Sequence, residues 1–117
     1  DALLMATPEY NCSISGVLKN AIDWASRPKE GNPLQGNTVA IMSASTGRFG
    51  GVRAQMHLRH CFVFLDMHSI NEHQLMLSDA ANNVEAKGRV TNEKTHQLMR
   101  QLLDALATWT IKLQYQP

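Results

Sequence analysis

The sequence predicts an α/β fold, a three-layer sandwich in which helices cover both faces of a parallel sheet. Short apolar runs without polar alternation recur along the chain, a pattern typical of strands buried on both faces. Longer segments with apolar residues at helical period separate these runs. Because each connection between strands contains a helix, it is long enough for parallel pairing. We therefore expect three strand-helix units.

The first unit opens the chain. Ala2 to Ala6 is an apolar run that predicts a strand buried on both faces. The segment Gly16 to Ser26 carries apolar residues at helical period, and Ser15 before it is a favourable N-cap residue. We expect this helix to end before Pro28, because a proline disfavours helical conformation in the residue that precedes it.

The second and third units follow the same order. Thr38 to Ala44 predicts a second buried strand, and Val52 to Phe64 predicts the helix after it. Met67 to Leu77 predicts a third strand that polar residues interrupt, and Ser78 to Arg89 a polar connection. Thr91 is the expected N-cap of a final helix. The apolar residues of that helix repeat at helical period: Leu98, Leu102, Leu106, Trp109 and Leu113.

The composition excludes several classes of partner. With 44% hydrophobic and 18% charged residues, the chain has the composition of a globular protein. Its net charge of +1 provides no field that would attract nucleic acid or an anionic membrane. No apolar run approaches the roughly 20 residues that span a bilayer. Cys12 and Cys61 have neither metal-ligand nor disulfide-framework spacing, which predicts a reducing, cytoplasmic location.

Two loops follow the first two predicted strands and are the candidate ligand site. Open α/β sheets bind ligands at the carboxyl ends of their strands, where the loops Thr7 to Ser15 and Ser43 to Gly51 are expected. The first loop supplies the aromatic ring of Tyr10 and the amide of Asn11, and the second supplies hydroxyl groups and glycines. These groups suit a planar ligand rich in heteroatoms. The alternative is that both loops are ordinary turns, but their position favours a ligand.

Three segments make the sequence resemble a known family. They are Thr-Pro-Glu-Tyr-Asn (Thr7 to Asn11), Gly-Val-Leu-Lys-Asn-Ala-Ile-Asp-Trp (Gly16 to Trp24) and Ser-x-Ser-x-Gly-x-x-Gly-Gly (Ser43 to Gly51). Together with Arg53 and the His57-Leu58-Arg59 run, they resemble the NADPH-dependent FMN reductase family, which includes quinone, chromate and azo-compound reductases. The resemblance implies a flavodoxin-like fold and covers essentially the whole chain.

The resemblance also implies a cofactor, a reaction and a set of binding residues. The cofactor is FMN, NAD(P)H is the co-substrate, and the electrons pass through the flavin to quinone, flavin, azo or metal-oxyanion acceptors. No side chain is expected to act as a nucleophile, because the flavin carries the chemistry. The residues that the resemblance places along the FMN ring are Pro8, Glu9, Tyr10, Asn11, Ser43, Ser45, Thr46, Gly47 and Gly50.

The family begins with a strand and a Gly-Ser-x-Arg-x-x-Ser-x-Asn loop that cradles the FMN phosphate, and these 117 residues contain no such loop. We therefore expect residues 1–117 to be the C-terminal part of a single flavodoxin-like FMN-binding domain, with an incomplete sheet. The alternative is a flavodoxin-like binding or assembly module that has lost its cofactor.

Other polar residues carry weaker hypotheses. His57 and His60 lie three residues apart on a predicted helix, but without an acidic or cysteine partner at suitable spacing no metal site is predicted. Cys12 is expected to be a small buried thiol rather than a redox residue. Arg48 and Arg53 belong either to the solvated surface or a subunit contact, or to a site that attracts a pyridine-nucleotide phosphate.

Finally, the two middle helices predict association. They carry more apolar residues than one face of a thin sheet needs, and such a surplus is typical of a subunit interface with closed symmetry. The resemblance also implies a homodimer or homotetramer. The alternative is that these residues fill a core completed by further strands. The expected contacts are Trp24, Met56, Phe62 and Phe64.

Overall fold

A computed structural model describes residues 1–115 of the chain. Strands and helices alternate as the sequence predicts, with the third strand in two short segments, except that the polar connection contains a short helix. In chain order the elements are β1 (Ala2–Thr7), α1 (Gly16–Ala25), β2 (Thr38–Ala44), α2 (Val52–Phe64), β3 (His68–Ser69), β4 (Leu75–Leu77), α3 (Ala80–Asn83) and α4 (Glu93–Gln114).

The sheet is parallel throughout the described residues. β1 pairs with β2 in register, from Ala2 opposite Thr38 to Thr7 opposite Ser43. β3 and β4 pair with the two ends of β2 on its other edge. The excursion between β3 and β4 is held by Arg59, which donates hydrogen bonds to Asn71 Oδ1 at 2.8 Å and to the carbonyl of Ile70 at 2.9 Å. The prediction of an interrupted third strand is therefore confirmed.

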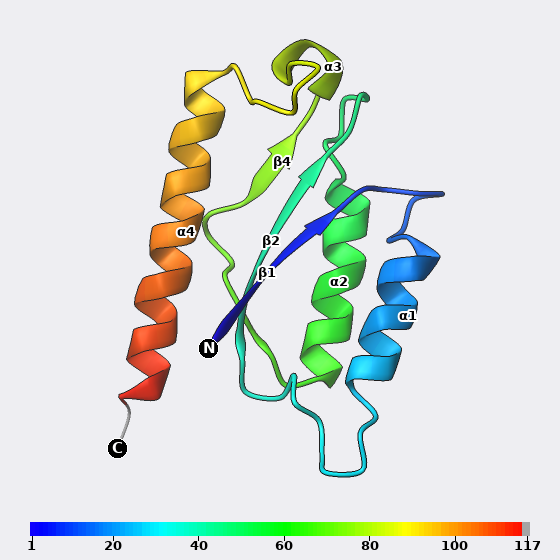
Figure 1. Cartoon of the computed structure of the whole chain (residues 1–117), viewed down its shortest axis with the longest axis vertical. Helices are drawn as coiled ribbons and strands as arrows, with labels where there is room; N and C mark the ends of the chain where they lie inside the picture. Colours follow the sequence, from blue (N-terminus) through cyan, green and yellow to red (C-terminus); the bar gives the residue numbers. More distant parts are fainter. Residues whose placement is uncertain (116–117) are drawn as a thin grey trace.

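Helices cover both faces of the sheet, as Figure 1 shows, with α1 and α2 on one side and α4 on the other. The side chains of β2 alternate between two cores: Val39 and Ile41 pack toward α1 and α2, and Ala40 packs toward α4. In α4, Leu102 and Leu106 fill the second core. The predicted three-layer α/β sandwich with a parallel sheet is confirmed.

The N-terminal ends of α1 and α4 show whether the two predicted N-cap residues are correct. Ser15 caps α1 as expected, and its hydroxyl accepts a hydrogen bond of 3.2 Å from the backbone N–H of Leu18. The prediction that Thr91 caps the last helix is wrong by one residue, because Asn92 Oδ1 accepts the capping bond from the N–H of Thr95 at 3.1 Å. The N–H and hydroxyl of Thr91 instead donate to the carbonyl of Asn83, which fastens the connection that precedes α4.

β1 is less buried than its apolar sequence predicts. Leu3 and Met5 pack against the core under α1 and α2, whereas Ala2, Leu4 and Ala6 are exposed on the opposite face. The reason is position: β1 is an edge strand that pairs only with β2 among the described strands, and α4 packs mainly over β2 and β4. The expectation of a strand buried on both faces is therefore wrong for these residues.

The apolar residues of α1 and α2 divide into two groups. Phe62 is 1% exposed and belongs to the core, so the prediction that it is a surface contact is wrong. Helical period explains the difference, because Phe62 lies one turn after Leu58 on the side of α2 that faces the sheet. Trp24, Met56 and Phe64 are exposed, as a contact role requires.

The two phenylalanines of α2 give a matched test of this division. In the full-length protein, Phe62→Ala should lower the free energy of unfolding by about 3–5 kcal/mol, because it leaves a cavity in the core. Phe64→Ala should change it by about 0.5 kcal/mol or less once association is removed. Urea unfolding at two protein concentrations measures both values and separates association from folding. Equal losses for the two variants would contradict the assignment of Phe62 to the core.

Candidate functional site

The candidate site lies where β1 and β2 end. Because these strands pair in register, Thr7 and Ser43 are neighbours, and the chain leaves the sheet from both at the same edge. We refer to residues 8–15 as loop 1 and to residues 45–51 as loop 2. The predicted juxtaposition of the two loops at the carboxyl ends of neighbouring strands is thus confirmed.

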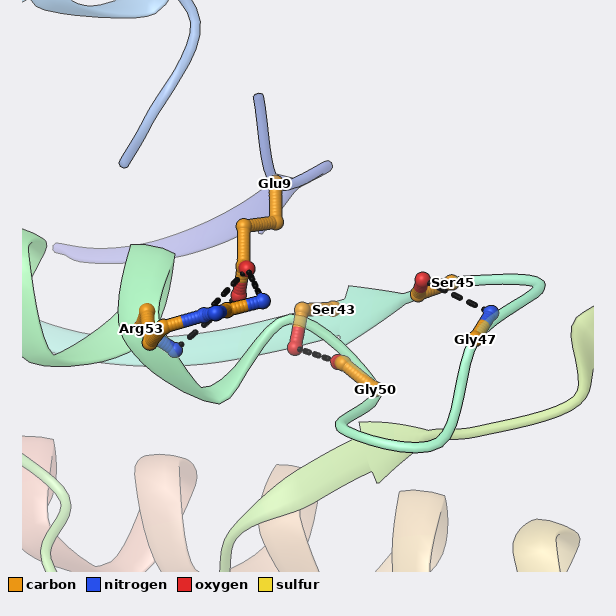
Figure 2. Close-up of polar contacts among 6 residues, drawn as sticks. All are labelled: Glu9, Ser43, Ser45, Gly47, Gly50 and Arg53. Carbon is orange, nitrogen blue, oxygen red and sulfur yellow. Dashed lines mark hydrogen bonds and ion pairs between the residues drawn. The ribbon is translucent and has the colours of Figure 1, made fainter. Parts of the chain in front are cut away.

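Loop 1 is joined to the start of α2 by Glu9 and Arg53, as Figure 2 shows. Glu9 Oε2 accepts a hydrogen bond of 3.1 Å from the backbone N–H of Arg53, and Oε1 accepts one of 2.6 Å from Arg53 Nε. Arg53 Nη2 lies 2.5 Å from the same Oε1. The N-cap residue of α2 is Gly51, which has no side chain, so the Glu9 carboxylate takes up part of the capping role at this helix end.

The electrostatics of this pair favour charge on both partners. Desolvation acts to raise the pKa of Glu9, but the hydrogen bonds from the Arg53 side chain and backbone, with the positive charge of Arg53, together hold the pKa of that carboxyl below its usual range. The Glu9 side chain is only 9% exposed, whereas the Arg53 side chain is about half exposed. The guanidinium carbon of Arg53 also lies 5.2 Å from the centre of the Phe49 ring, within the range of a cation–π contact.

Loop 2 is supported from within by a buried polar network. The hydroxyl of Ser43 donates a hydrogen bond of 2.5 Å to the carbonyl of Gly50. Gln55 Nε2 donates to Ser43 Oγ and to the carbonyl of Leu75, both at 2.8 Å. Gln55, which was not among the residues predicted from the sequence, ties loop 2, β2 and β4 together. Its position on the sheet-facing side of the helix could have indicated this role, because a buried polar side chain needs hydrogen-bond partners.

Two glycines allow loop 2 to pass close to the sheet. A Cβ on Gly51, whose φ is +86°, would lie 2.7 Å from Ser43 Cβ. A Cβ on Gly50 would lie 2.8 Å from the backbone of Met76. Both distances are shorter than any tolerated contact, so only glycine fits at these positions. The sequence predicted that glycines would let loop 2 approach a ligand closely. In the structure, Gly50 and Gly51 instead let the loop approach β2 and β4.

Loop 1 turns sharply at its tip. Tyr10 and Ser13 exchange two backbone hydrogen bonds of 2.9 Å, and Asn11 and Cys12 between them have left-handed φ angles of 49° and 64°. The turn raises the Tyr10 ring to the surface, where it is 61% exposed. Cys12 is also exposed, so the expectation of a buried thiol is wrong, and the reason is its place at the tip of the turn.

The nine predicted site residues differ in how far they face solvent. Glu9, Ser43 and Gly50 point their polar groups inward, into the contacts just described. Ser45 is intermediate, and its hydroxyl accepts a hydrogen bond of 3.0 Å from the N–H of Gly47. The residues that are exposed to solvent are Pro8, Tyr10, Asn11, Thr46 and Gly47. The exposed group offers an aromatic face, an amide and a hydroxyl on two adjoining loops, which is the chemistry that a planar, heteroatom-rich ligand requires.

A third loop supports the site, and the sequence analysis described it only as a polar connection. The N–H groups of Asp79 and Ala80 donate to the carbonyls of Gly47 and Ser45, at 3.2 and 2.9 Å. These bonds fasten the chain after β4 along loop 2. An apolar cavity of about 400 Å³ opens beside the loops on the α4 side, and Pro8 and Ser43 are among its lining residues. A second cavity, of about 540 Å³, lies between residues 69–73 and α4 and shares no residue with either loop.

The histidines of α2 have other surroundings. His57 Nδ1 shares a hydrogen bond of 2.8 Å with the Ser13 hydroxyl, so it joins loop 1 to α2. Within residues 1–115, no cluster of three or more His, Cys, Asp or Glu side chains could hold a metal ion. Over the same residues, no helix is long and apolar enough to cross a membrane.

The fold and the two loops define a flavodoxin-like α/β protein, and comparison with known proteins identifies its family. The sequence pattern of NADPH-dependent FMN reductases matches residues 1–82, and the chain belongs to this family. It is 55% identical over 113 residues to an NAD(P)H-dependent FMN reductase of Pseudomonas aeruginosa, and 44% identical over 115 residues to an NAD(P)H:quinone oxidoreductase of Solanum tuberosum.

A solved structure supports the same conclusion. FerB of Paracoccus denitrificans, a flavoenzyme NAD(P)H:(acceptor) oxidoreductase, matches with a TM-score of 0.83 and 35% identity over 95% of this chain. The two sequence matches each cover 97% of this chain. The chain spans 60% and 58% of those two relatives and 61% of FerB. The resemblance in sequence and the flavodoxin-like fold are thus both confirmed.

The close packing of Gly51 against Ser43 can be tested by comparing its substitution with that of Gly36. Gly51→Ala should destabilise the full-length protein by about 2–5 kcal/mol, because it adds a steric clash to the strain of a left-handed backbone. Gly36 has a similar φ of +75° but no atom within 4 Å of a built Cβ, so Gly36→Ala carries only the strain, about 1–2 kcal/mol. Chemical denaturation compares the two. Losses of the same size would show that loop 2 does not pass as close to Ser43 as described.

Proposed function

We propose that the full-length protein is an FMN-dependent NAD(P)H oxidoreductase that passes electrons through the bound flavin to small acceptors. The observation that carries the proposal is the pair of adjoining loops, in which Tyr10, Asn11, Thr46 and Gly47 are exposed at the carboxyl edge of the sheet. Relatives described as FMN reductases and quinone oxidoreductases support the reaction class. Quinones are the acceptors that the relatives favour, and free flavin, azo compounds and metal oxyanions are further candidates.

The chemistry of the two loops fits an isoalloxazine ring. The ring is flat and carries carbonyl and N–H groups along its edge, and Tyr10 and Asn11 offer an aromatic face and a side-chain amide to such a ligand. Pro8 adds an apolar surface, and the second loop adds Ser45, Thr46 and the backbone of Gly47. Glu9, Ser43 and Gly50 hold these groups in place from behind.

Bound FMN would supply the redox chemistry, by accepting a hydride from a nicotinamide and delivering electrons to the acceptor. The chain contributes position and charge. Backbone N–H groups of the loops can stabilise negative charge on the ring, and no side chain is needed as a nucleophile. We further propose that residues 1–117 form the C-terminal part of one FMN-binding domain, and that the phosphate is held by residues outside them. The cytoplasm is the proposed compartment, because it supplies reduced pyridine nucleotides.

Flavin binding by the full-length protein tests this proposal. We expect a yellow protein whose absorbance near 450 nm, roughly the position of the oxidised flavin band, is bleached by NADPH. Tyr10→Ala and Asn11→Ala should each weaken FMN binding about tenfold, because a stacked ring or a hydrogen bond contributes on the order of 1 kcal/mol. The control is Tyr115→Ala, an exposed tyrosine at the end of α4, which should bind FMN as the wild type does.

A full-length protein that stays colourless and inert with added FMN and NADPH would contradict the proposal. It would favour the alternative, a flavodoxin-like module without a cofactor that acts through its helices.

We also propose that the protein forms a homodimer or homotetramer through the side of the molecule covered by α1 and α2. Large apolar side chains are exposed on this side: Val17, Trp24, Met56, Val63 and Phe64. Several large apolar side chains exposed on the same two helices are more typical of a subunit interface than of free surface. Closed symmetry would bring the same surface of two subunits together.

Light scattering on the full-length protein tests the interface. Trp24→Glu should weaken association by about thirtyfold or more, because a charged side chain replaces a large aromatic contact. Ile111→Glu, which changes an exposed apolar residue of α4, is the control and should leave the molecular mass unchanged. A wild-type monomer at micromolar concentration would remove the proposed interface.

A further inference from the structure

We propose that Glu9 is a positioning residue of the flavin site, which clamps loop 1 to the first turn of α2 and neutralises Arg53 beside the ring. The inference rests on the proposed function and refines one of its residues. The resemblance assigns Glu9 to packing along the flavin and to positioning the backbone, and its side-chain contacts with Arg53 support the second of these roles. The charge that Glu9 brings to Arg53 is the new element of the inference.

Both oxygens of the Glu9 carboxylate are engaged by Arg53 within the protein. Oε2 accepts the backbone N–H of Arg53 at 3.1 Å, and Oε1 accepts Arg53 Nε at 2.6 Å and lies 2.5 Å from Nη2. Its side chain is almost fully buried, whereas the next two residues, Tyr10 and Asn11, are exposed. Glu9 is therefore the internal anchor of the loop, and its neighbours are the groups that face a ligand.

Glu9 anchors a strained turn at the tip of loop 1. Tyr10 and Ser13 close the turn with two hydrogen bonds, and Asn11 and Cys12 are held at left-handed φ angles that most side chains avoid. Such a turn persists only where the surrounding contacts fix it. Glu9 on one side and the Ser13–His57 hydrogen bond on the other both attach loop 1 to α2. Loss of the Glu9 contacts should leave the Tyr10 and Asn11 positions poorly defined.

Glu9 also balances the charge of Arg53. The guanidinium of Arg53 lies at the junction of the two loops, against Phe49 of loop 2 and Glu9 of loop 1. An unpaired positive charge there would favour the reduced, more negative flavin over the oxidised one. The Glu9 carboxylate cancels that charge. Glu9 should therefore hold the midpoint potential of the bound flavin below the value that Arg53 alone would give.

Charge-neutral variants of the FMN-loaded, full-length protein separate these effects. Glu9→Gln should weaken FMN binding about tenfold, since a charged hydrogen-bonded pair is lost. It should also change the ratio of reduced to oxidised FMN affinity about tenfold, which raises the two-electron midpoint potential by about 30 mV. Arg53→Gln should move the potential in the opposite direction, because the Glu9 carboxylate is then unpaired.

The double variant separates the effect of charge from the loss of the Glu9–Arg53 contact. In E9Q/R53Q both charges are absent, so the potential should return to the wild-type value while FMN binding stays weak. A redox titration against a reference dye measures the potentials.

Amide hydrogen exchange of the cofactor-free protein should show faster exchange at Arg53 and Ala54 in Glu9→Gln. The matched control is Glu30→Gln. Glu30 is exposed and lies in the connection between α1 and β2, at the amino ends of the strands, so its substitution should change none of these values.

The outcomes are distinguishable. If the wild type binds FMN but Glu9→Gln and Arg53→Gln leave its potential and the exchange rates unchanged, the role of Glu9 is refuted and the proposed function stands. If the wild type binds no FMN, the proposed function fails and this inference fails with it. Should Glu9→Gln fold poorly, the opposite shift in Arg53→Gln still decides the matter.

Discussion

The in-register parallel pairing of β1 and β2 is the constraint on which the rest of the structure depends. It places Thr7, the last residue of β1, beside Ser43, one residue before the end of β2, and so both loops leave the sheet close together. A slip of one residue would turn the core residues Val39 and Ile41 to the opposite face. Hydrophobic burial therefore fixes the register, and the register fixes the relative position of the loops. The site is a consequence of the core.

The loops divide their residues between support and exposure. Polar groups that point inward set the backbone path: Glu9 toward α2, and Ser43 with Gln55 beneath Gly50. This internal pairing leaves the aromatic and amide groups of the loop tips free to meet a ligand. The same division explains why a family motif mixes residues that touch a cofactor with residues that only hold the others.

Local pattern predicted much of this molecule. Thr38–Ala44 and Val52–Phe64 form where expected, because apolar runs and helical period depend on neighbours in sequence. The pairing of Glu9 with Arg53 spans 44 residues and no local pattern contains it. The buried role of Gln55 and the exposed face of β1 likewise depend on which element packs against them. Gln55 was not singled out by the sequence, and the expectations for β1 and Phe62 were wrong, because a local pattern does not say which element packs against a side chain.

The central claim is that the exposed tips of loops 1 and 2 form one face of a flavin site. Amide chemical shifts of the ¹⁵N-labelled, full-length protein during titration with FMN test it most directly. The account predicts that the largest changes within residues 1–115 occur at Asn11, Thr46 and Gly47. Changes concentrated instead around the cavity between residues 69–73 and α4, with these three amides unmoved, would contradict it.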